Sequence, residues 1–184
     1  MSSVTKRALA ASFKKLLGTR ALDKITVKDI VEDAQVNRQT FYYHYHDIYD
    51  LVRWIFDEET RLGDVLEDKS CDWKAYLRDV FKTMTEERTM VINVFHSLCR
   101  EHLEQYLYGV MYKLICNKLD DLCRDLTLSD EDRRFIADCY KYAIVGVILD
   151  WIRRGMRDDP EQLVDKLILM LEGRLRPCAE KFSS

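Results

Sequence analysis

The sequence predicts an all-helical fold, and three observations point to it. The 184 residues include 6 Gly and 2 Pro, which are too few turn formers for a many-stranded sandwich or barrel. Apolar residues recur every three or four positions along almost the whole chain, which is the spacing of helices. A composition of 47% hydrophobic and 33% charged residues gives such helices a core to bury and a charged surface.

The N-terminal part of the chain predicts three helices. Apolar spacing marks the first over about 3–17, and Gly18 is expected to stop it. The second, over about 26–34, opens on a capping box, in which a Thr and the Asp three residues later cap each other's backbone N–H groups. Asn37 is a favourable N-cap for the third, over about 37–45.

The rest of the chain continues in longer helices. The expected helical stretches are 47–68 (with Leu62, Val65 and Leu66 inward), 73–84, 88–99 (with Leu98 inward), 103–122, 129–154 and 160–175. The last two are apolar on more sides than one small bundle can cover, so we expect them to form a dimer interface rather than only a monomer core. Ala143 and Gly146 would allow close helix approach there. The expected domains are residues 1–47 and 48–184.

Several classes of protein are disfavoured by the sequence. The longest apolar stretch, 142–149, is far short of the roughly 20 residues of a membrane helix, and the N-terminus does not resemble a secretory signal. We therefore expect a cytoplasmic protein without a membrane partner. No Gly-rich phosphate loop, GxSxG or HExxH motif occurs, so neither catalysis nor a cofactor is expected.

The cysteines and histidines give little sign of a metal site. Six cysteines without a CxxC pair are expected to be reduced core thiols. His96, Cys99 and His102 share one helical face, which suits a soft metal. A core Cys99 and a solvated His102 are the favoured alternative, so no metal is expected.

Charge is distributed unevenly along the chain. Residues 1–46 hold eight Lys/Arg and four Asp/Glu, a balance of +4, whereas the net charge of −3 leaves −7 for the remainder. A basic front on an acidic body indicates an anionic partner for the front.

Two short helices joined by the tight turn at Gln35 and Val36 form a candidate helix-turn-helix. Arg38 and Gln39 suit bidentate hydrogen bonds to guanine and adenine, and Thr40 is small enough to approach a base. The side chains and helix ends expected to face phosphates belong to Thr26, Asn37, Tyr42, Tyr43 and His44. The alternative is that these are exposed polar residues of an ordinary helical bundle.

Two segments, residues 25–30 (Ile-Thr-Val-Lys-Asp-Ile) and 34–45, resemble the signature of the TetR family of transcriptional regulators. The resemblance implies a dimeric, all-helical protein that binds double-stranded operator DNA. Carried over by position, it implies phosphate contacts from Thr26, Lys28, Tyr42, Tyr43 and His44, base contacts from Arg38, Gln39 and Thr40, and packing roles for Ile30, Phe41 and Tyr45.

Two positions depart from the family pattern. Gln35 stands where the family usually has Gly, which implies a different turn or a left-handed residue at some cost. Ile48 stands where a phosphate-binding Lys is usual, so one charge contact per subunit is missing.

Residues 37–42, 51–56 and 152–155 resemble more narrowly a subgroup similar to the activator of dihydroxyacetone kinase operons. Members of that subgroup act with a kinase-like coregulator protein.

The family pattern also implies a ligand pocket in the C-terminal helices and a dimer interface on the last two. Candidate pocket residues are Phe81, Met84, Phe95, His96, Tyr106, Met111, Tyr140 and Trp151. Most such apolar stripes are simply core. The expected function is an operator-binding dimer controlled by a small-molecule effector. The alternatives are an adaptor whose signal is a protein coregulator, and a helical dimer with no role on DNA.

Overall fold

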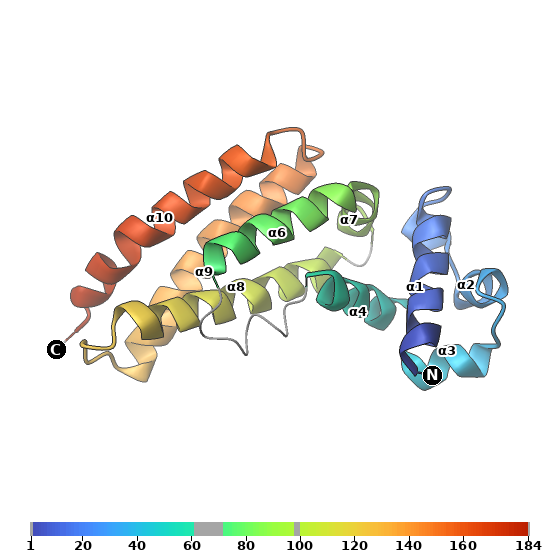
Figure 1. Cartoon of the computed structure of the whole chain (residues 1–184), viewed down its shortest axis with the longest axis horizontal. Helices are drawn as coiled ribbons and strands as arrows, with labels where there is room; N and C mark the ends of the chain where they lie inside the picture. Colours follow the sequence, from blue (N-terminus) through green and yellow to red (C-terminus); the bar gives the residue numbers. More distant parts are fainter. Residues whose placement is uncertain (1, 61–71, 98–99, 184) are drawn as a thin grey trace. The chain divides into compact units, whose positions relative to one another are not determined.

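A computed structural model of the chain describes residues 2–60, 72–97 and 100–183 (Figure 1). These described residues form helices and no strand, which confirms the all-helical prediction. The α-helices are α1 (Ser2–Leu17), α2 (Val27–Asp33), α3 (Arg38–His44), α4 (Ile48–Thr60), α6 (Trp73–Glu86), α7 (Arg88–Phe95), α8 (Arg100–Leu122), α9 (Asp130–Arg153) and α10 (Pro160–Glu180), with a short 3₁₀ turn at Leu22–Lys24.

The helices group into two compact units. The head unit comprises residues 1–60 and 87–103, and the body unit comprises residues 61–86 and 104–184. This division differs from the expected boundary at residue 47, because α4 and α7 belong with α1. The Lys14 ammonium, for example, lies 2.8 Å from a carboxylate oxygen of Glu87 at the start of α7.

The head unit is built on the apolar face of α1. Leu9 and Phe13 of α1 are fully buried, as are Ile30 of α2 and Phe41 of α3. The buried hydroxyl of Ser12 donates to the backbone carbonyl of Ile30 at 3.0 Å, so this polar group between α1 and α2 is satisfied. The helical spacing of these apolar residues predicted the packing correctly.

The body unit is a bundle of α6, α8, α9 and α10 (Figure 1). Its largest fully buried side chain is Trp151 of α9, whose ring lies 5.3 Å from that of Phe81. The Trp151 indole N–H donates to the backbone carbonyl of Asp158 at 3.1 Å, which ties the end of α9 to the turn before α10.

The ends of α1 and α9 lie where the sequence predicts them, though not always by the predicted mechanism. The first helix ends at Leu17 as predicted, yet Gly18 does not adopt a positive φ. Its N–H bonds to the carbonyls of Lys14 and Lys15, so a tightened last turn ends α1. Gly155, with φ 75°, directly follows the residue that caps α9.

The last helix is longer than predicted, since it ends at Glu180 rather than near residue 175. Pro177 lies inside it and removes one N–H from the helical ladder. The helix continues because Pro177 is exposed and the carbonyl left without a donor, four residues earlier, also belongs to an exposed residue that water can reach. Arg176 fastens this segment through two bonds, at 2.9 and 2.7 Å, to Asp125 in the α8–α9 loop.

Other expectations are only partly covered. The long helix expected over 47–68 is described to Thr60, and Leu62, Val65, Leu66, Cys71, Leu98 and Cys99 lie outside the described residues. The described cysteines are free thiols, but Cys139 is exposed and Cys123 alone among them is buried, so most are not core residues. No described helix has the length and apolar character that crossing a bilayer requires.

Candidate nucleic-acid interface

The capping box predicted for the second helix is present at the start of α2. The Thr26 hydroxyl oxygen accepts the Asp29 N–H at 3.3 Å, and the Thr26 N–H donates to Asp29 Oδ2 at 2.8 Å. The Thr26 hydroxyl donates to the same carboxylate, and Arg20 lies 3.1 Å from its other oxygen. Hydrogen bonds from the Thr26 side chain and backbone, with a smaller contribution from Arg20, lower the pKa of Asp29 to about 2. The start of α2 is therefore firmly fixed.

The turn between α2 and α3 is a Schellman motif with a left-handed Gln35. Its φ is 55°, and the Val36 N–H donates to the Val31 carbonyl at 2.9 Å while the Gln35 N–H reaches Glu32 at 3.3 Å. The missing glycine is thus accommodated by a left-handed residue rather than by a different turn. Such a conformation costs a non-glycine residue roughly 1–2 kcal/mol.

The first turn of α3 is held by its N-cap. Asn37 Oδ1 accepts both the backbone N–H of Thr40, at 2.8 Å, and the Thr40 hydroxyl, at 2.9 Å. The Thr40 hydroxyl proton is therefore directed to the cap, which leaves the methyl group and the hydroxyl oxygen for other contacts. Phe41, fully buried, anchors the same turn to the core.

The remaining predicted packing residues are also buried. Ile30 is fully buried, and Tyr45 is 3% exposed with its ring 5.7 Å from that of Phe41. The helix-turn-helix therefore turns its apolar residues inward, as its sequence predicts.

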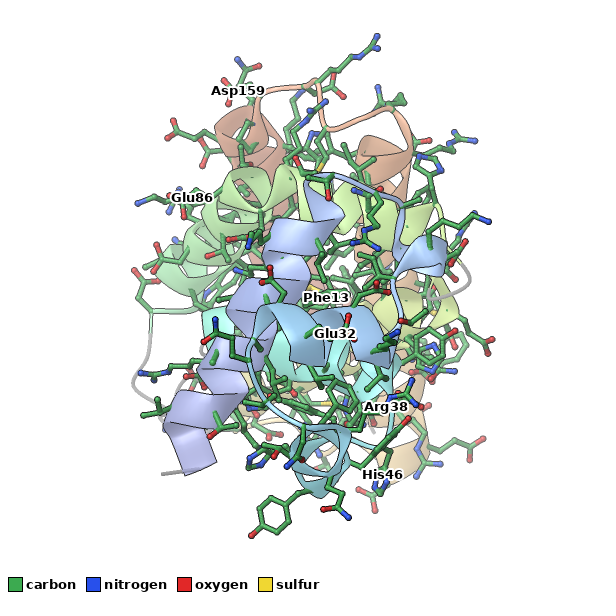
Figure 2. The ribbon with its side chains drawn as sticks, turned by 90° about the vertical axis from the view of Figure 1, so that its right-hand side faces the viewer. Phe13, Glu32, Arg38, His46, Glu86 and Asp159 are labelled. Atoms are coloured by element: carbon green, nitrogen blue, oxygen red, sulfur yellow. The ribbon has the colours of Figure 1, made fainter. Side chains whose placement is uncertain are left out.

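The polar residues expected at DNA lie on the surface of the head unit, which Figure 2 faces, with Arg38 and His46 labelled towards its lower end. Tyr43 is 83% exposed and Tyr42 is 56% exposed. The other predicted contact residues are exposed at Thr26, Lys28, Asn37, Arg38 and Gln39, and half-buried at Thr40 and His44. The structure thus brings this whole set onto α3 and the start of α2.

Much of the basic front is neutralised within the protein. Five of its cations lie within 4.0 Å of a carboxylate, in the pairs Arg7–Glu58, Lys14–Glu87, Lys15–Asp33, Arg20–Asp29 and Lys28–Glu32. Arg38 has no such partner among the described residues. Arg38 of α3 is therefore among the cations of the front that no carboxylate of the described residues neutralises.

Ile48 lines a surface groove and supplies no cation. It lines a groove of about 290 Å³ on the head unit together with Val27, Tyr42 and Asp47, among others. The groove lies beside residues expected at the phosphates. An aliphatic side chain and a carboxylate at this position offer no attraction to a phosphate.

The predicted pocket residues are not gathered around one cavity. Phe81, Met84, Met111 and Trp151 are buried in the body unit, Tyr106 and Tyr140 are half-buried there, and in the head unit Phe95 is buried and His96 is exposed. Met111 alone of this set lines the cavity at Trp73 and Lys118 described below. The spacing of apolar residues marks Trp73 as inward but does not place it at a cavity, and Lys118 has no sequence signal because a single cation beside an apolar stripe is typical of a solvated helix edge.

The metal expectation can be followed only in part. Cys99 lies outside the described residues, and His102, though exposed, stacks on Tyr49. Within the described part of the chain, no three His, Cys, Asp or Glu residues come together as metal ligands would.

Comparisons with known proteins agree with this geometry. A family model described as bacterial regulatory proteins of the tetR family matches residues 4–54. A second, described as a transcriptional regulator C-terminal region, matches residues 71–173. The first covers the helix-turn-helix, and the second covers more than half of the chain.

The similarity to individual relatives covers nearly the whole chain. The HTH-type dhaKLM operon transcriptional activator DhaS of Lactococcus lactis is 23% identical over 180 residues, covering 95% of this chain and 92% of its own. A solved structure of a dihydroxyacetone kinase operon activator DhaS superposes with a TM-score of 0.73 at 22% identity, over 98% of this chain and 99% of the other.

A repressor shares the fold as well. NalD of Pseudomonas aeruginosa, the secondary repressor of the MexAB-OprM multidrug efflux pump, superposes with a TM-score of 0.62 at 15% identity, over 93% of this chain and 96% of its own. At such identities the solved structures show the fold alone. With the two family models and the geometry of α2 and α3, they lead to one conclusion: the chain belongs to the tetR family of bacterial regulatory proteins, and it is a DNA-binding transcriptional regulator rather than an enzyme.

Proposed function

We propose that this regulator binds a palindromic operator as a homodimer, with α3 of each copy in the major groove. The observation that carries the proposal is the first turn of α3. Arg38 and Gln39 are exposed there, while the buried Phe41 and the Asn37 cap fix the helix that presents them. Side chains held in this way can make bidentate bonds to guanine and adenine.

The dimer is supported by an apolar face on α9 and α10 whose side chains stay largely exposed in the described chain. Its large side chains are Tyr142 (57% exposed), Val147 (40%), Leu169 (74%) and Met170 (39%). Ala143 and Gly146 are exposed between them, and a Cβ placed on Gly146 would meet open space. A second copy packed on this face would bury the apolar sides of these two helices that one small bundle cannot cover.

The signal is proposed to be a small molecule taken up by the body unit, where a cavity opens beside Trp73. A protein coregulator is the second candidate. It is favoured by the similarity, over 95% of this chain, to a relative named as an activator of the dhaKLM operon, together with the kinase-like coregulator that the subgroup resemblance implies.

The operator proposal is tested by selecting genomic fragments with the full-length protein at near-physiological salt. Wild type should enrich a palindrome whose half-sites are centred about 34 Å apart, and Arg38→Ala/Gln39→Ala should lose it. The control is Lys113→Ala, an exposed substitution on α8. Enrichment of the same palindrome by the double variant would contradict the role given to α3.

The dimer is tested by sedimentation of the full chain at micromolar concentration. Wild type should sediment as a dimer, and Leu169→Glu should sediment as a monomer. Val4→Glu is the matched control, because Val4 is also 74% exposed but lies on α1. A monomeric wild type, or dimers from both variants, would contradict this assignment of the interface.

The two candidate signals are separated by filtration of cell extract through a membrane that retains proteins. Operator affinity is measured with the filtrate and with the protease-treated and untreated retentate. A small effector should act from the filtrate and survive protease. An effect confined to the retentate and abolished by protease would favour the coregulator instead.

A further inference from the structure

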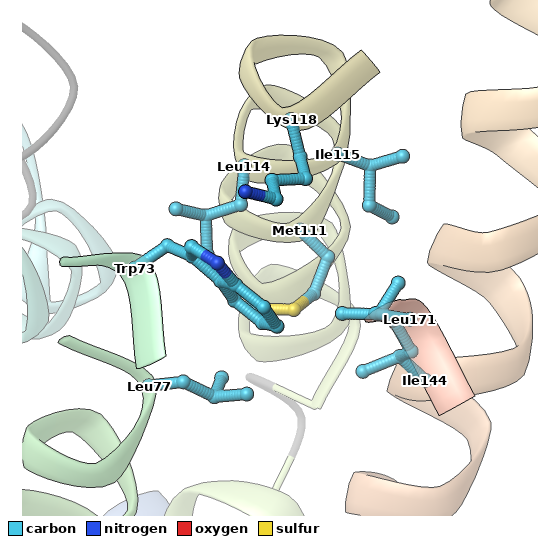
Figure 3. Close-up of a pocket in the computed structure, with 8 residues that line it drawn as sticks. All are labelled: Trp73, Leu77, Met111, Leu114, Ile115, Lys118, Ile144 and Leu171. Atoms are coloured by element: carbon cyan, nitrogen blue, oxygen red, sulfur yellow. The ribbon is translucent and has the colours of Figure 1, made fainter. Parts of the chain in front are cut away.

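The body unit contains a narrow apolar cavity lined by residues of α6, α8, α9 and α10 (Figure 3). Its lining includes Trp73 and Leu77 of α6, Met111 and Lys118 of α8, Ile144 of α9 and Leu171 of α10. The enclosed part measures about 10 Å³, roughly the room for one water, so a larger ligand requires the cavity to open.

The floor and the mouth of this cavity differ in character. Leu77, Met111 and Ile144 are at most 3% exposed, so the floor is fixed and apolar. Trp73 and Lys118, by contrast, are half-buried at the mouth. Trp73 and Lys118 are therefore the lining residues with most room to move when the enclosed space enlarges.

Lys118 is the one charged group among the residues that line the cavity. Its ammonium lies 5.6 Å from the centre of the Trp73 ring, and no carboxylate of the described residues pairs with it. The cations on the neighbouring α6 differ, since Lys74 pairs with Glu172 at 2.6 Å and Arg78 with Asp165 at 2.7 Å. Lys118 thus holds its charge against an indole face, an attraction that a bound anion can replace.

We propose that this cavity binds a small aliphatic monocarboxylate. Its hydrocarbon chain would lie over the apolar floor between Leu77 and Ile144. Its carboxylate would form an ion pair with the Lys118 ammonium, replacing the contact of that ammonium with the Trp73 ring. A single cation above an otherwise apolar lining favours a ligand with one negative charge and a hydrocarbon chain. A neutral hydrocarbon would form no ion pair with the Lys118 ammonium, and a polyanion would bury a second negative charge without a cation to pair with it. The inference rests on the proposed small-molecule effector and names its chemical class.

Occupancy of the cavity would bear on the proposed dimer face. Ile144 and Leu171 line the cavity, and their near neighbours Ala143 and Met170 are exposed on the apolar face of α9 and α10. A hydrocarbon chain pressing on Ile144 and Leu171 therefore acts on the helices proposed to pair with the second copy. This gives the ligand a route to alter operator binding.

Calorimetric titration of the full-length protein tests the site without DNA, with octanoate as the probe and 1-octanol as its neutral analogue. Wild type should bind octanoate at least tenfold more tightly than octanol, and about tenfold more tightly than hexanoate, which lacks two methylenes. Lys118→Met keeps the length of the side chain and should remove the preference for octanoate over octanol. Lys113→Met, on the exposed side of the same helix, should retain it.

Tryptophan emission locates the binding. Octanoate should change the emission of wild type, and Trp73→Phe should abolish that change while calorimetry still detects binding. No binding at millimolar octanoate, equal affinity for octanoate and octanol, or an unchanged preference in Lys118→Met would overturn the proposal.

Operator selection separates this inference from the proposed function. A protein that enriches a palindrome but does not bind octanoate overturns the carboxylate site and leaves the regulator intact. A protein that binds octanoate through Lys118 without any change in operator affinity keeps the site and contradicts the effector role.

Discussion

Tyr49, in the first turn of α4, stacks on His102, in the first turn of α8, with ring centroids 5.0 Å apart and ring planes 13° apart. Both residues belong to the head unit, so the start of α8 is fastened there before the helix continues into the body unit. The sequence predicted a merely solvated His102. The stack gives that histidine a structural role that helical periodicity alone did not indicate.

The coupling between these two rings can be measured directly. In a double-mutant cycle with Tyr49→Leu and His102→Leu, urea unfolding should give an interaction free energy of about 0.5–1.5 kcal/mol, the range for stacked aromatic pairs. Tyr49→Phe retains the ring and should retain most of that coupling. Additive single substitutions would show that the stack contributes nothing to stability.

Because Gln35 has a left-handed backbone conformation, replacing it with glycine should change stability in an unusual direction. Gln35→Gly should stabilise the protein by roughly 0.5–1 kcal/mol, because relief of the strained φ exceeds the entropy that glycine adds to the unfolded chain. Ala34→Gly is the matched control, since Ala34 has a φ of −77° and gains only the entropic penalty. A loss of stability in both variants, measured by urea denaturation, would argue against strain at residue 35.

The sequence predicted local features well and distant pairings poorly. The caps at Thr26 and Asn37 and the burial of Phe41 were predictable, because each depends on residues within one or two helical turns. The pairing of Lys14 with Glu87, 73 residues apart, was not, and so the basic front looked more available to DNA than it is. Ion pairs of this kind depend on tertiary packing, which composition does not report.

The cavity at Trp73 illustrates the same limit. Its lining comes from four helices, and only Met111 belonged to the predicted pocket set. Periodicity identified which face of each helix is apolar, but not where the faces leave space between them. The fold and the surface position of the candidate DNA-contact residues were therefore predictable from the sequence, whereas the cavity was visible only in three dimensions.

The lowered pKa of Asp29 implies that the stability of the protein depends on pH in a specific way. Because its folded pKa is about 2 against an ordinary value of 3.8, its contribution is present above about pH 4 and is lost as pH falls towards 2. The difference in unfolding free energy between wild type and Asp29→Asn should therefore shrink between pH 5 and pH 2. Asp79→Asn, an exposed change on α6, is the control. A difference that stays constant over this range would contradict the capping role of the carboxylate.

Restoring a cation at residue 48 should strengthen DNA binding. Ile48→Lys adds one phosphate contact per subunit, so the slope of log K against log salt should steepen by about 2 for the dimer. Thr89→Lys adds the same charge at an exposed site on α7 and should leave the slope nearly unchanged. Equal slopes for wild type and Ile48→Lys in operator titrations would place residue 48 away from the phosphates.

The most direct test of base recognition by α3 combines a protein substitution with a base substitution. Wild type and Arg38→Ala are titrated against the selected operator and against operators in which each G·C pair of the half-site is exchanged in turn. At the base pair that Arg38 reads, wild type should lose about 1–3 kcal/mol of binding free energy per half-site, and Arg38→Ala should not distinguish the two operators. If Arg38→Ala weakens binding equally on every operator, Arg38 serves only as a phosphate contact and the assignment of α3 as the base-reading helix is contradicted.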